Sequence, residues 1–336
     1  MSKSIFAVCD LEASYARSLM EYLNEKKSTP FEVQAFTCLE SLSQFASERE
    51  IEILLISSRL MCDEIRELKV NRIIILSEGD RISEEQEEFP SIYKYQSCDD
   101  ILAEVMEYYV TDHPASPYVH TGKVKTRIYG VYSPVGRCRK TSFALTLGEV
   151  LAEKKEVLYI NLEEYSGFEE LFNTKYKLDI SDLIYFSRQN DGGLIYKLNS
   201  VIQNLREMQY IPPALSPVDL RDVSGREWTD LLQEITACCE YEVIILELSS
   251  QVEDMFSLLQ MCDRIYLPTL DDPFSQAKLN QYERLVNMLG LGDILEKTQK
   301  VKPPRQVLQT GQSQMIQQLL WGEMGNYVRQ LLWEEE

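Results

Sequence analysis

Histidine, paired cysteines and long apolar runs are scarce or missing in this chain of 336 residues. It has two histidines, His113 and His120, and its eight cysteines form no CxxC pair. This composition disfavours a metal cluster and indicates reduced thiols. The strongest apolar runs, residues 53–56 and 243–246, are far shorter than the roughly 18 residues that cross a bilayer. The first residues, MSKSIFAVCD, show no signal-peptide pattern, so we expect a cytoplasmic protein without direct membrane insertion.

Positive charge is also in short supply. Lys plus Arg total 34 against 54 for Asp plus Glu, which gives a formal net charge of −20. Such an excess repels phosphate backbones and anionic lipid surfaces, so nucleic-acid binding is disfavoured. Hydrophobic residues make up 44% of the chain, as in globular proteins. At roughly 150 residues per domain, the length predicts about two domains.

The first region, residues 1–111, alternates short apolar segments with amphipathic ones. Strands are predicted at 5–9, 31–36, 53–57, 72–76 and 92–95. Helices are predicted at 11–26 and 38–46, and a last one follows Ser97-x-x-Asp100, which resembles a capping box. Repeated βα units of this kind predict a doubly wound parallel sheet.

The order of these units resembles a response-regulator receiver domain, which is flavodoxin-like. In receivers, acidic residues after the first strand hold a metal, and an Asp ending the third strand accepts phosphate. A hydroxyl and a lysine end the fourth and fifth strands. Asp10, Glu12, Ser77 and Lys94 match in kind, but Ser57 stands where the phosphoacceptor belongs.

A neutral hydroxyl is a poor nucleophile for phosphoryl transfer. The resemblance therefore implies a degenerate receiver that serves protein contact or dimerisation. In the alternative reading, Asp10, Glu12 and Lys94 are ordinary polar residues at strand ends.

Residues 112–124 break the pattern and are predicted to be a linker, because they contain two prolines and no apolar period. A second α/β region follows over 125–336. Its strands are predicted at 127–132, 157–161, 208–211, 243–248 and 264–268. Its helices are predicted at 141–153, 180–186, 227–238, 254–261 and 274–289, and an amphipathic segment at 315–333 ends it.

The start of this second region carries the main chemical signal. The strand at 127–132 runs into SPVGRCRKTS and a helix, a context in which backbone N–H groups bind phosphates. Lys140 fits the lysine that reaches the terminal phosphates, and Thr141 or Ser142 fits the hydroxyl on Mg²⁺. The strict GxxxxGK[ST] pattern fails, because Pro134 and Arg139 occupy its two glycine positions.

Three later segments extend the signal: KKEVLYINLE, YEVIILELSS and DRIYLPTLDDPFSQAKL. Their relevant residues are Asn161, Glu163, Glu247, Pro268, Asp272 and Pro273. In this order they resemble the ParA/MinD group of deviant-Walker ATPases, whose signatures are KGGxGKT[ST], a strand ending DxD and a strand ending D-x-x-P. With the receiver-like region in front, the chain resembles TadZ/CpaE-like proteins of tight-adherence pilus and type II/IV secretion systems.

This resemblance implies a P-loop, ParA/MinD-like α/β domain that binds ATP or ADP with Mg²⁺. It also implies a homodimer whose partners are a pilus or secretion ATPase or other assembly proteins. By this resemblance Thr141 and Glu247 would bind magnesium, and Glu163 is the carboxylate that could position the attacking water. The residues expected to contact the nucleotide are Gly136, Arg137, Cys138, Arg139, Lys140, Thr141, Ser142, Pro268, Asp272 and Pro273.

Departures from the signatures point to weak catalysis. Val135 stands at the lysine that family dimers insert into the partner's site, and Arg137 and Arg139 replace glycines. Arg139 also brings a Cβ where glycine lets the backbone approach phosphate. Asn161 and Glu163 replace two aspartates, and phosphoryl transfer depends mostly on positioning and charge stabilisation. We therefore expect nucleotide binding with weak or lost hydrolysis. An ATPase that cycles between monomer and dimer, and a nucleotide-free scaffold, remain alternatives.

The main cationic stretch of this acidic chain contains no acidic residue and lies between residues 123 and 140. Its members are Lys123, Lys125, Arg127, Arg137, Arg139 and Lys140. Three of the six fall inside the loop, which favours a polyphosphate site over a solvated strand edge. Near the C-terminus, the segment at 315–333 has Arg329 as its one cation. It is expected to pack on its own domain or on a partner rather than on a membrane.

Overall fold

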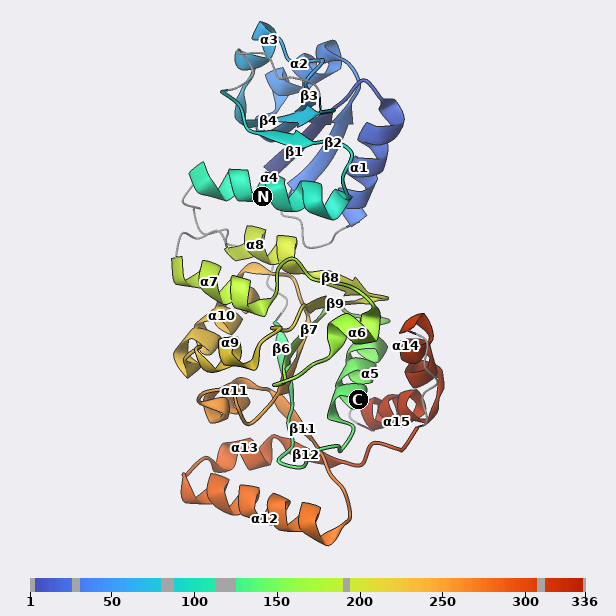
Figure 1. Cartoon of the computed structure of the whole chain (residues 1–336), viewed down its shortest axis with the longest axis vertical. Coiled ribbons are helices and arrows are strands. Elements are labelled where there is room, and N and C mark those ends of the chain that lie inside the picture. Colours follow the sequence, from blue (N-terminus) through green and yellow to red (C-terminus); the bar gives the residue numbers. More distant parts are fainter. Residues whose placement is uncertain are drawn as a thin grey trace. The chain divides into compact units, whose positions relative to one another are not determined.

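The computed structural model describes residues 4–25, 31–79, 88–112, 125–189, 194–306 and 312–334. The chain divides into two compact units, residues 1–121 with 190–200 and residues 122–189 with 201–336. Each unit is built on its own sheet (Figure 1). The predicted linker at 112–124 lies outside the described residues, apart from Asp112 at the end of a helix. The segment at 190–200, which the sequence places in the second domain, groups with the first unit.

The first unit contains a five-stranded parallel sheet in the order β2-β1-β3-β4-β5. This is the flavodoxin-like strand order, whose topological switch point, where the order in which strands are added reverses, lies between β1 and β3. The strands are β1 (Ser4–Cys9), β2 (Phe31–Phe36), β3 (Ile51–Ser57), β4 (Val70–Ser77) and β5 (Ser91–Tyr93). The helices are α1 (Ala13–Glu25), α2 (Leu39–Glu48), α3 (Asp63–Arg66) and α4 (Cys98–Asp112). The predicted parallel α/β architecture is confirmed.

Both faces of this sheet are covered by helices, and the alternation of β1 side chains decides which helix meets which face. Ile5 shares a buried cluster with Leu42 of α2. Its neighbour Phe6 points the other way, and its ring contacts Phe31 edge-on, which in turn contacts Tyr109 of α4. Because successive strand residues point to opposite faces, a sheet covered on both sides needs the nearly continuous apolar strands seen in the sequence.

The second unit contains a seven-stranded sheet in the order β12-β11-β6-β10-β7-β9-β8. All neighbours are parallel except β8 and β9. The strands are β6 (Arg127–Val131), β7 (Val157–Leu162), β8 (Gln203–Leu205), β9 (Met208–Ile211), β10 (Val243–Leu248), β11 (Arg264–Pro268) and β12 (Thr298–Val301). The sequence reading missed β8 and β12, because short, polar edge strands lack the apolar run that marks a buried strand.

The helices of the second region include several that the apolar pattern did not show. Those expected are α5 (Lys140–Ala152), α7 (Ile180–Gln189), α10 (Gly225–Cys238), α11 (Met255–Met261) and α12 (Pro273–Met288). Those missed are α6 (Phe168–Phe172), α8 (Leu194–Val201), α9 (Pro217–Arg221) and α13 (Gly292–Glu296). Three of the four missed helices have only five residues, too few to show a helical period.

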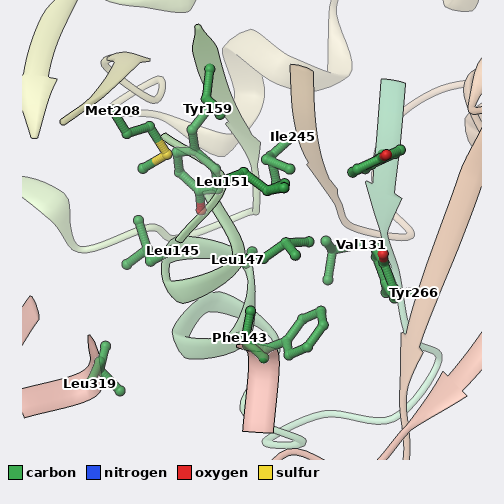
Figure 2. Packing of buried hydrophobic residues seen from close by; sticks show 14 of the residues in the cluster. Val131, Phe143, Leu145, Leu147, Leu151, Tyr159, Met208, Ile245, Tyr266 and Leu319 are labelled. Carbon is green, nitrogen blue, oxygen red and sulfur yellow. The ribbon is translucent and has the colours of Figure 1, made fainter. Parts of the chain in front are cut away.

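Helix α5 is the buried centre of the second unit. Its residues from Phe143 to Leu147 are all buried. On one side it packs against the sheet, where Val131, Tyr159 and Ile245 belong to the same cluster (Figure 2). On the other side it is covered by α14 (Gln312–Trp321) and α15 (Glu323–Trp333). The amphipathic C-terminal segment therefore packs on its own unit.

A glycine sets the distance between these two C-terminal helices. The segment predicted at 315–333 is broken at Gly322, which precedes α15. A Cβ on Gly325 would lie 1.9 Å from the carbonyl oxygen of Leu320 in α14. Glycine is therefore required for the close approach of α14 and α15 at this point.

One buried charge stands out inside this apolar packing. Glu149 of α5 is 1% exposed, and neither of its carboxylate oxygens has a hydrogen-bond partner among the described residues. The nearest cation, Arg206 Nε, lies 3.9 Å from Oε2. Burial raises the pKa of Glu149 from 4.5 to about 7.

This pKa predicts a stability that depends on pH. The contribution of Glu149 is fully present below its unfolded pKa of 4.5 and is lost as the pH rises through about 7. We expect the unfolding free energy to fall by about 3 kcal/mol between about pH 5 and about pH 8, relative to Glu149→Gln. Urea unfolding of both proteins measures this difference. Parallel pH profiles for the two proteins would contradict the prediction.

Candidate functional site

The loop between β6 and α5 presents open backbone donors. Arg139 is the N-cap residue of α5, its side chain makes no capping hydrogen bond, and the first helical turn has no acidic residue. Within the described part of the chain, no backbone carbonyl accepts a hydrogen bond from the N–H groups of Gly136, Arg137 or Cys138. Such N–H groups beside a helix N-terminus fit an anion, because donors and helix dipole both favour negative charge.

Two arginines of this loop have the left-handed backbone conformation that favours glycine. Arg137 has φ of 59° and Arg139 has φ of 66°. This left-handed conformation costs an L-residue roughly 1–2 kcal/mol. Arg139 Nη1 donates a hydrogen bond to the carbonyl oxygen of Pro303 at 2.8 Å, a contact far along the chain from the loop. Two residues with a Cβ thus hold left-handed positions in the turn of this loop.

Sheet order brings the later candidate residues to this loop. Strand β10 lies between β6 and β7, and its Glu247 is in register with Val131 of β6 and Asn161 of β7. Because the three strands are parallel, their carboxyl ends meet at one edge of the sheet. The loop after β6, Glu163 just after β7 and Glu247 near the end of β10 therefore share one site.

Glu247 is the most enclosed charged group of this site. It is 0% exposed. Thr141 Oγ1 donates a hydrogen bond to Oε1 at 2.7 Å, and Tyr159 OH donates one to Oε2 at 2.6 Å. Asn161 Nδ2 lies 3.4 Å from Oε2 and donates to Tyr159 OH at 2.8 Å. Burial raises the pKa of Glu247 to about 7, although Lys140 and the hydrogen bonds lower it.

Lys140 is held by two partners. Its Nζ donates a hydrogen bond to the carbonyl oxygen of Leu248 at 2.7 Å and forms an ion pair with Glu163 Oε1. Glu163 is itself positioned by its backbone N–H, which donates to Asn161 Oδ1 at 2.9 Å. The lysine assigned to phosphate thus has a carboxylate for a partner, and an incoming phosphate competes with that carboxylate.

Cys138 and Pro268 support the loop from inside the protein. Cys138 is buried, its Sγ donates to the carbonyl oxygen of Val135 at 3.0 Å, and burial raises the pKa of its thiol. Pro268 accepts a hydrogen bond from Ser133 Oγ at 2.7 Å, which joins β11 to the loop. Val135 is also buried, so its side chain is directed into the protein. These residues shape the loop.

The remaining predicted contacts have local explanations in the structure. Asp272 caps α12, because its carboxylate accepts hydrogen bonds from Phe274 N at 3.1 Å and Ser275 N at 3.0 Å. Hydrogen bonds from Ser275 hold the pKa of Asp272 below its usual value. Pro273 is the first residue of α12, a position that suits proline. Ser142 lies in the first turn of α5, and its carbonyl oxygen accepts from Thr146 Oγ1 at 2.7 Å.

Tyr159 contributes to the site and was missed by the sequence reading, and Asn161 was noted only as a replacement for aspartate. Both follow the alternation Tyr159-x-Asn161-x-Glu163, which puts the three side chains on one face of the strand end. A tyrosine in an apolar strand is normally a core residue, so the sequence pattern alone does not assign Tyr159 to the site. Its hydrogen bond to Glu247 does.

The five described cations of the stretch at 123–140 do not form one cluster. Arg137, Arg139 and Lys140 lie at the carboxyl end of β6, whereas Lys125 and Arg127 lie at its amino end. A strand rises about 3.3 Å per residue, so the five residues of β6 separate the two groups by about 16 Å. Lys123 lies outside the described residues.

The residues of the site fit a nucleotide with Mg²⁺. Among the described residues, no group of three His, Cys, Asp or Glu side chains could hold a metal alone. Magnesium bound with a nucleotide needs only one or two protein ligands beside phosphate oxygens and water. Thr141 and Glu247 would supply those ligands, and the open N–H groups with Lys140 would hold the phosphates.

The first unit carries a separate polar cluster at the carboxyl edge of its sheet. Lys94 is 1% exposed, and its Nζ lies 3.0 Å from Asp10 Oδ2, 3.1 Å from Glu12 Oε1 and 3.5 Å from Glu78 Oε1. Burial opposes the charge on Lys94, but hydrogen bonds to Asp10 and Glu12 outweigh it and raise the pKa of Lys94. The ammonium group thus neutralises carboxylates that would otherwise attract a metal ion.

The two serines at this edge cap their own turns. Ser57 Oγ accepts a hydrogen bond from the N–H of Arg59 at 3.4 Å, and Ser77 Oγ accepts one from Gly79 at 3.1 Å. Of the five predicted residues of this edge, Asp10, Glu12 and Lys94 are in direct contact, whereas Ser57 and Ser77 bond to the backbone of their own turns.

Several solved structures resemble part of this chain in fold. A ParA family ATPase from Chlorobium tepidum is 15% identical, with a TM-score of 0.49 over 61% of this chain and 98% of that chain. A plasmid partition protein from Borrelia burgdorferi is 15% identical, with a TM-score of 0.45 over 63% of this chain and 100% of that chain.

A cobyrinic acid a,c-diamide synthase from Mycobacterium smegmatis, solved with ADP and magnesium, is 15% identical, with a TM-score of 0.41 over 58% of this chain and 79% of that chain. No protein-family model and no curated protein matches the chain. At these identities and TM-scores the likenesses carry no weight for the activity. Among the described helices, none combines the length and apolarity needed to cross a bilayer.

Removing the carboxylate partner of Lys140 is expected to change nucleotide affinity. Glu163→Gln frees the ammonium group for phosphate, so ATP should bind roughly three- to tenfold more tightly. Isothermal titration calorimetry measures the change. Glu164→Gln is the matched control, because the neighbouring Glu164 pairs with Arg221 at 2.7 Å instead. Equal affinity in wild type and Glu163→Gln would show that the ion pair does not restrain Lys140.

Removing the buried lysine of the first unit is expected to destabilise that unit. Lys94→Met leaves Asp10 and Glu12 without their cation, which should cost about 3 kcal/mol of unfolding free energy. Urea unfolding measures the loss, and the exposed Lys69→Met is the control for a lost surface charge. A loss equal to that of Lys69→Met would contradict a structural role for Lys94.

Proposed function

We propose that this chain is a nucleotide-binding assembly factor of the ParA/MinD type, similar to TadZ/CpaE proteins, with weak or absent ATP hydrolysis. The observation that carries the proposal is the convergence of Lys140, Thr141 and Glu247 at an uncapped helix N-terminus with open backbone donors. Helix dipole, N–H donors and a lysine together favour a polyphosphate. ATP or ADP with Mg²⁺ is the ligand that this set suits.

Weak hydrolysis follows from what surrounds the phosphate site. Glu163, the carboxylate that would position water, is paired with Lys140. Val135 stands at the signature lysine, and its buried side chain supplies no cation to a second subunit. Phosphoryl transfer is accelerated by positioning and by charge stabilisation, and both are reduced here.

The assembly role rests on the first unit. With its lysine held among carboxylates and a serine in place of the phosphoacceptor, this unit suits protein contact better than phosphorelay chemistry. Residues 1–111 contain 11 basic and 22 acidic side chains, so the unit offers an acidic surface to partners. In this proposal the protein is a cytoplasmic homodimer that recruits a pilus or secretion ATPase.

Calorimetry with Mg²⁺ and ATP or ADP tests whether the protein binds nucleotide. Wild type should bind both nucleotides, and Lys140→Ala should weaken binding by about tenfold or more, because a charge-assisted contact with phosphate is lost. Steady-state ATP turnover should be slow or undetectable in wild type. Lys175→Ala, which removes an exposed lysine outside the loop, should leave binding unchanged.

Two outcomes would decide against the proposal. Absence of nucleotide binding by wild type would favour a nucleotide-free scaffold. Rapid turnover that is abolished by Lys140→Ala and Glu163→Gln would favour a cycling ATPase.

Light scattering with and without ATP measures dimerisation. Mass spectrometry of proteins co-purified with wild type and Lys140→Ala tests the assembly role, which requires pilus or secretion components among the partners of wild type.

A further inference from the structure

A basic cavity of about 600 Å³ lies in the second unit, at the edge of the sheet opposite the loop at 132–139. It is lined by the starts of β6 and β11, the end of α5 and the end of α15. A volume of this size falls in the range of small-molecule sites, roughly 300–1,000 Å³. The cavity therefore has room for a ligand of its own.

The charge of this cavity is opposite to that of the chain. Its cations are Lys125, Arg127, Lys154, Lys155, Arg264 and Arg329. Two acidic side chains, Glu153 and Asp263, share the lining. In a protein of net charge −20, a concave surface with three times as many cations as acids is a marked local exception.

Both acidic side chains already have partners. Glu153 Oε1 pairs with Arg329 Nη2 at 3.0 Å, and Asp263 Oδ2 accepts a hydrogen bond from the N–H of Ile128 at 2.8 Å. Among the described residues, no carboxylate lies within 4.0 Å of the charged nitrogens of four other lining residues. These are Lys125, Arg127, Lys154 and Lys155. Their positive charge remains available to a ligand.

The C-terminal dipole of α5 explains part of this pattern only. Lys154 and Lys155 follow that helix, where cations offset the partial negative charge of the carbonyl groups. Lys125 and Arg127 come from the start of β6, a separate segment that contributes no helix end to the cavity. Cations from separate segments converge on one hollow, which a helix dipole does not require.

We propose that this cavity is a second anion-binding site, for a small soluble molecule with two or more phosphate groups. Guanidinium and ammonium groups together suit phosphate oxygens, because arginine binds them in a forked geometry and lysine as a point charge. A concave site admits a small anion, whereas the acidic remainder of the chain repels an extended polyanion.

Pyrophosphate binding, measured by calorimetry, tests this site in the full chain. Lys140→Ala serves as the background, because it weakens the other phosphate site. Arg127→Ala with Lys154→Ala removes two exposed cations from the cavity. Lys278→Ala with Arg284→Ala removes the same two residue types from the exposed side of α12 and is the matched control.

The cavity variant should bind pyrophosphate about tenfold or more weakly than the background, and the control variant should bind it equally well. Arg127→Lys, which keeps the charge, should retain most of the affinity. Equal binding by cavity and control variants would overturn the proposal, as would absence of binding by the background protein. Vesicles of phosphatidylglycerol provide a further arm, and a response to vesicles without one to pyrophosphate would overturn a soluble ligand.

Discussion

The buried carboxylate of Glu247 is the constraint on which the candidate site depends. A charge taken out of water costs several kcal/mol unless hydrogen bonds compensate it. Thr141 and Tyr159 provide those bonds directly, and Asn161 supports Tyr159. The requirement to satisfy one carboxylate thus ties the first turn of α5 to β10 and β7. Lys140 follows, since it immediately precedes Thr141.

The loop before α5 keeps its shape through its surroundings more than through its own residues. Left-handed conformations at Arg137 and Arg139 are unfavourable for side chains with a Cβ, so other contacts must compensate. The hydrogen bonds from Arg139 to Pro303 and from Ser133 to Pro268 do so from two different strand ends. Contacts that hold a loop in one conformation lower the ordering cost of binding.

Both units place a lysine beside carboxylates at the carboxyl edge of a parallel sheet. Lys94 lies among Asp10, Glu12 and Glu78, and Lys140 pairs with Glu163. Each lysine cancels the charge of one carboxylate at this edge, where polar side chains gather. Each lysine therefore offsets part of the negative charge at its own edge of the sheet.

The sequence alone determined the parallel α/β character of both regions, since apolar strands that alternate with amphipathic helices leave few other arrangements. It also identified Lys140, Thr141, Glu163 and Glu247, because the segments that carry them follow strands in a characteristic order. Only the tertiary structure decided which of these meet. The insertion of β10 between β6 and β7 is a long-range pairing that no local pattern encodes, and it makes Glu247 the partner of Thr141 and Tyr159. For the same reason a continuous cationic stretch became two groups at opposite ends of β6, because a strand carries its two ends to opposite edges of the sheet.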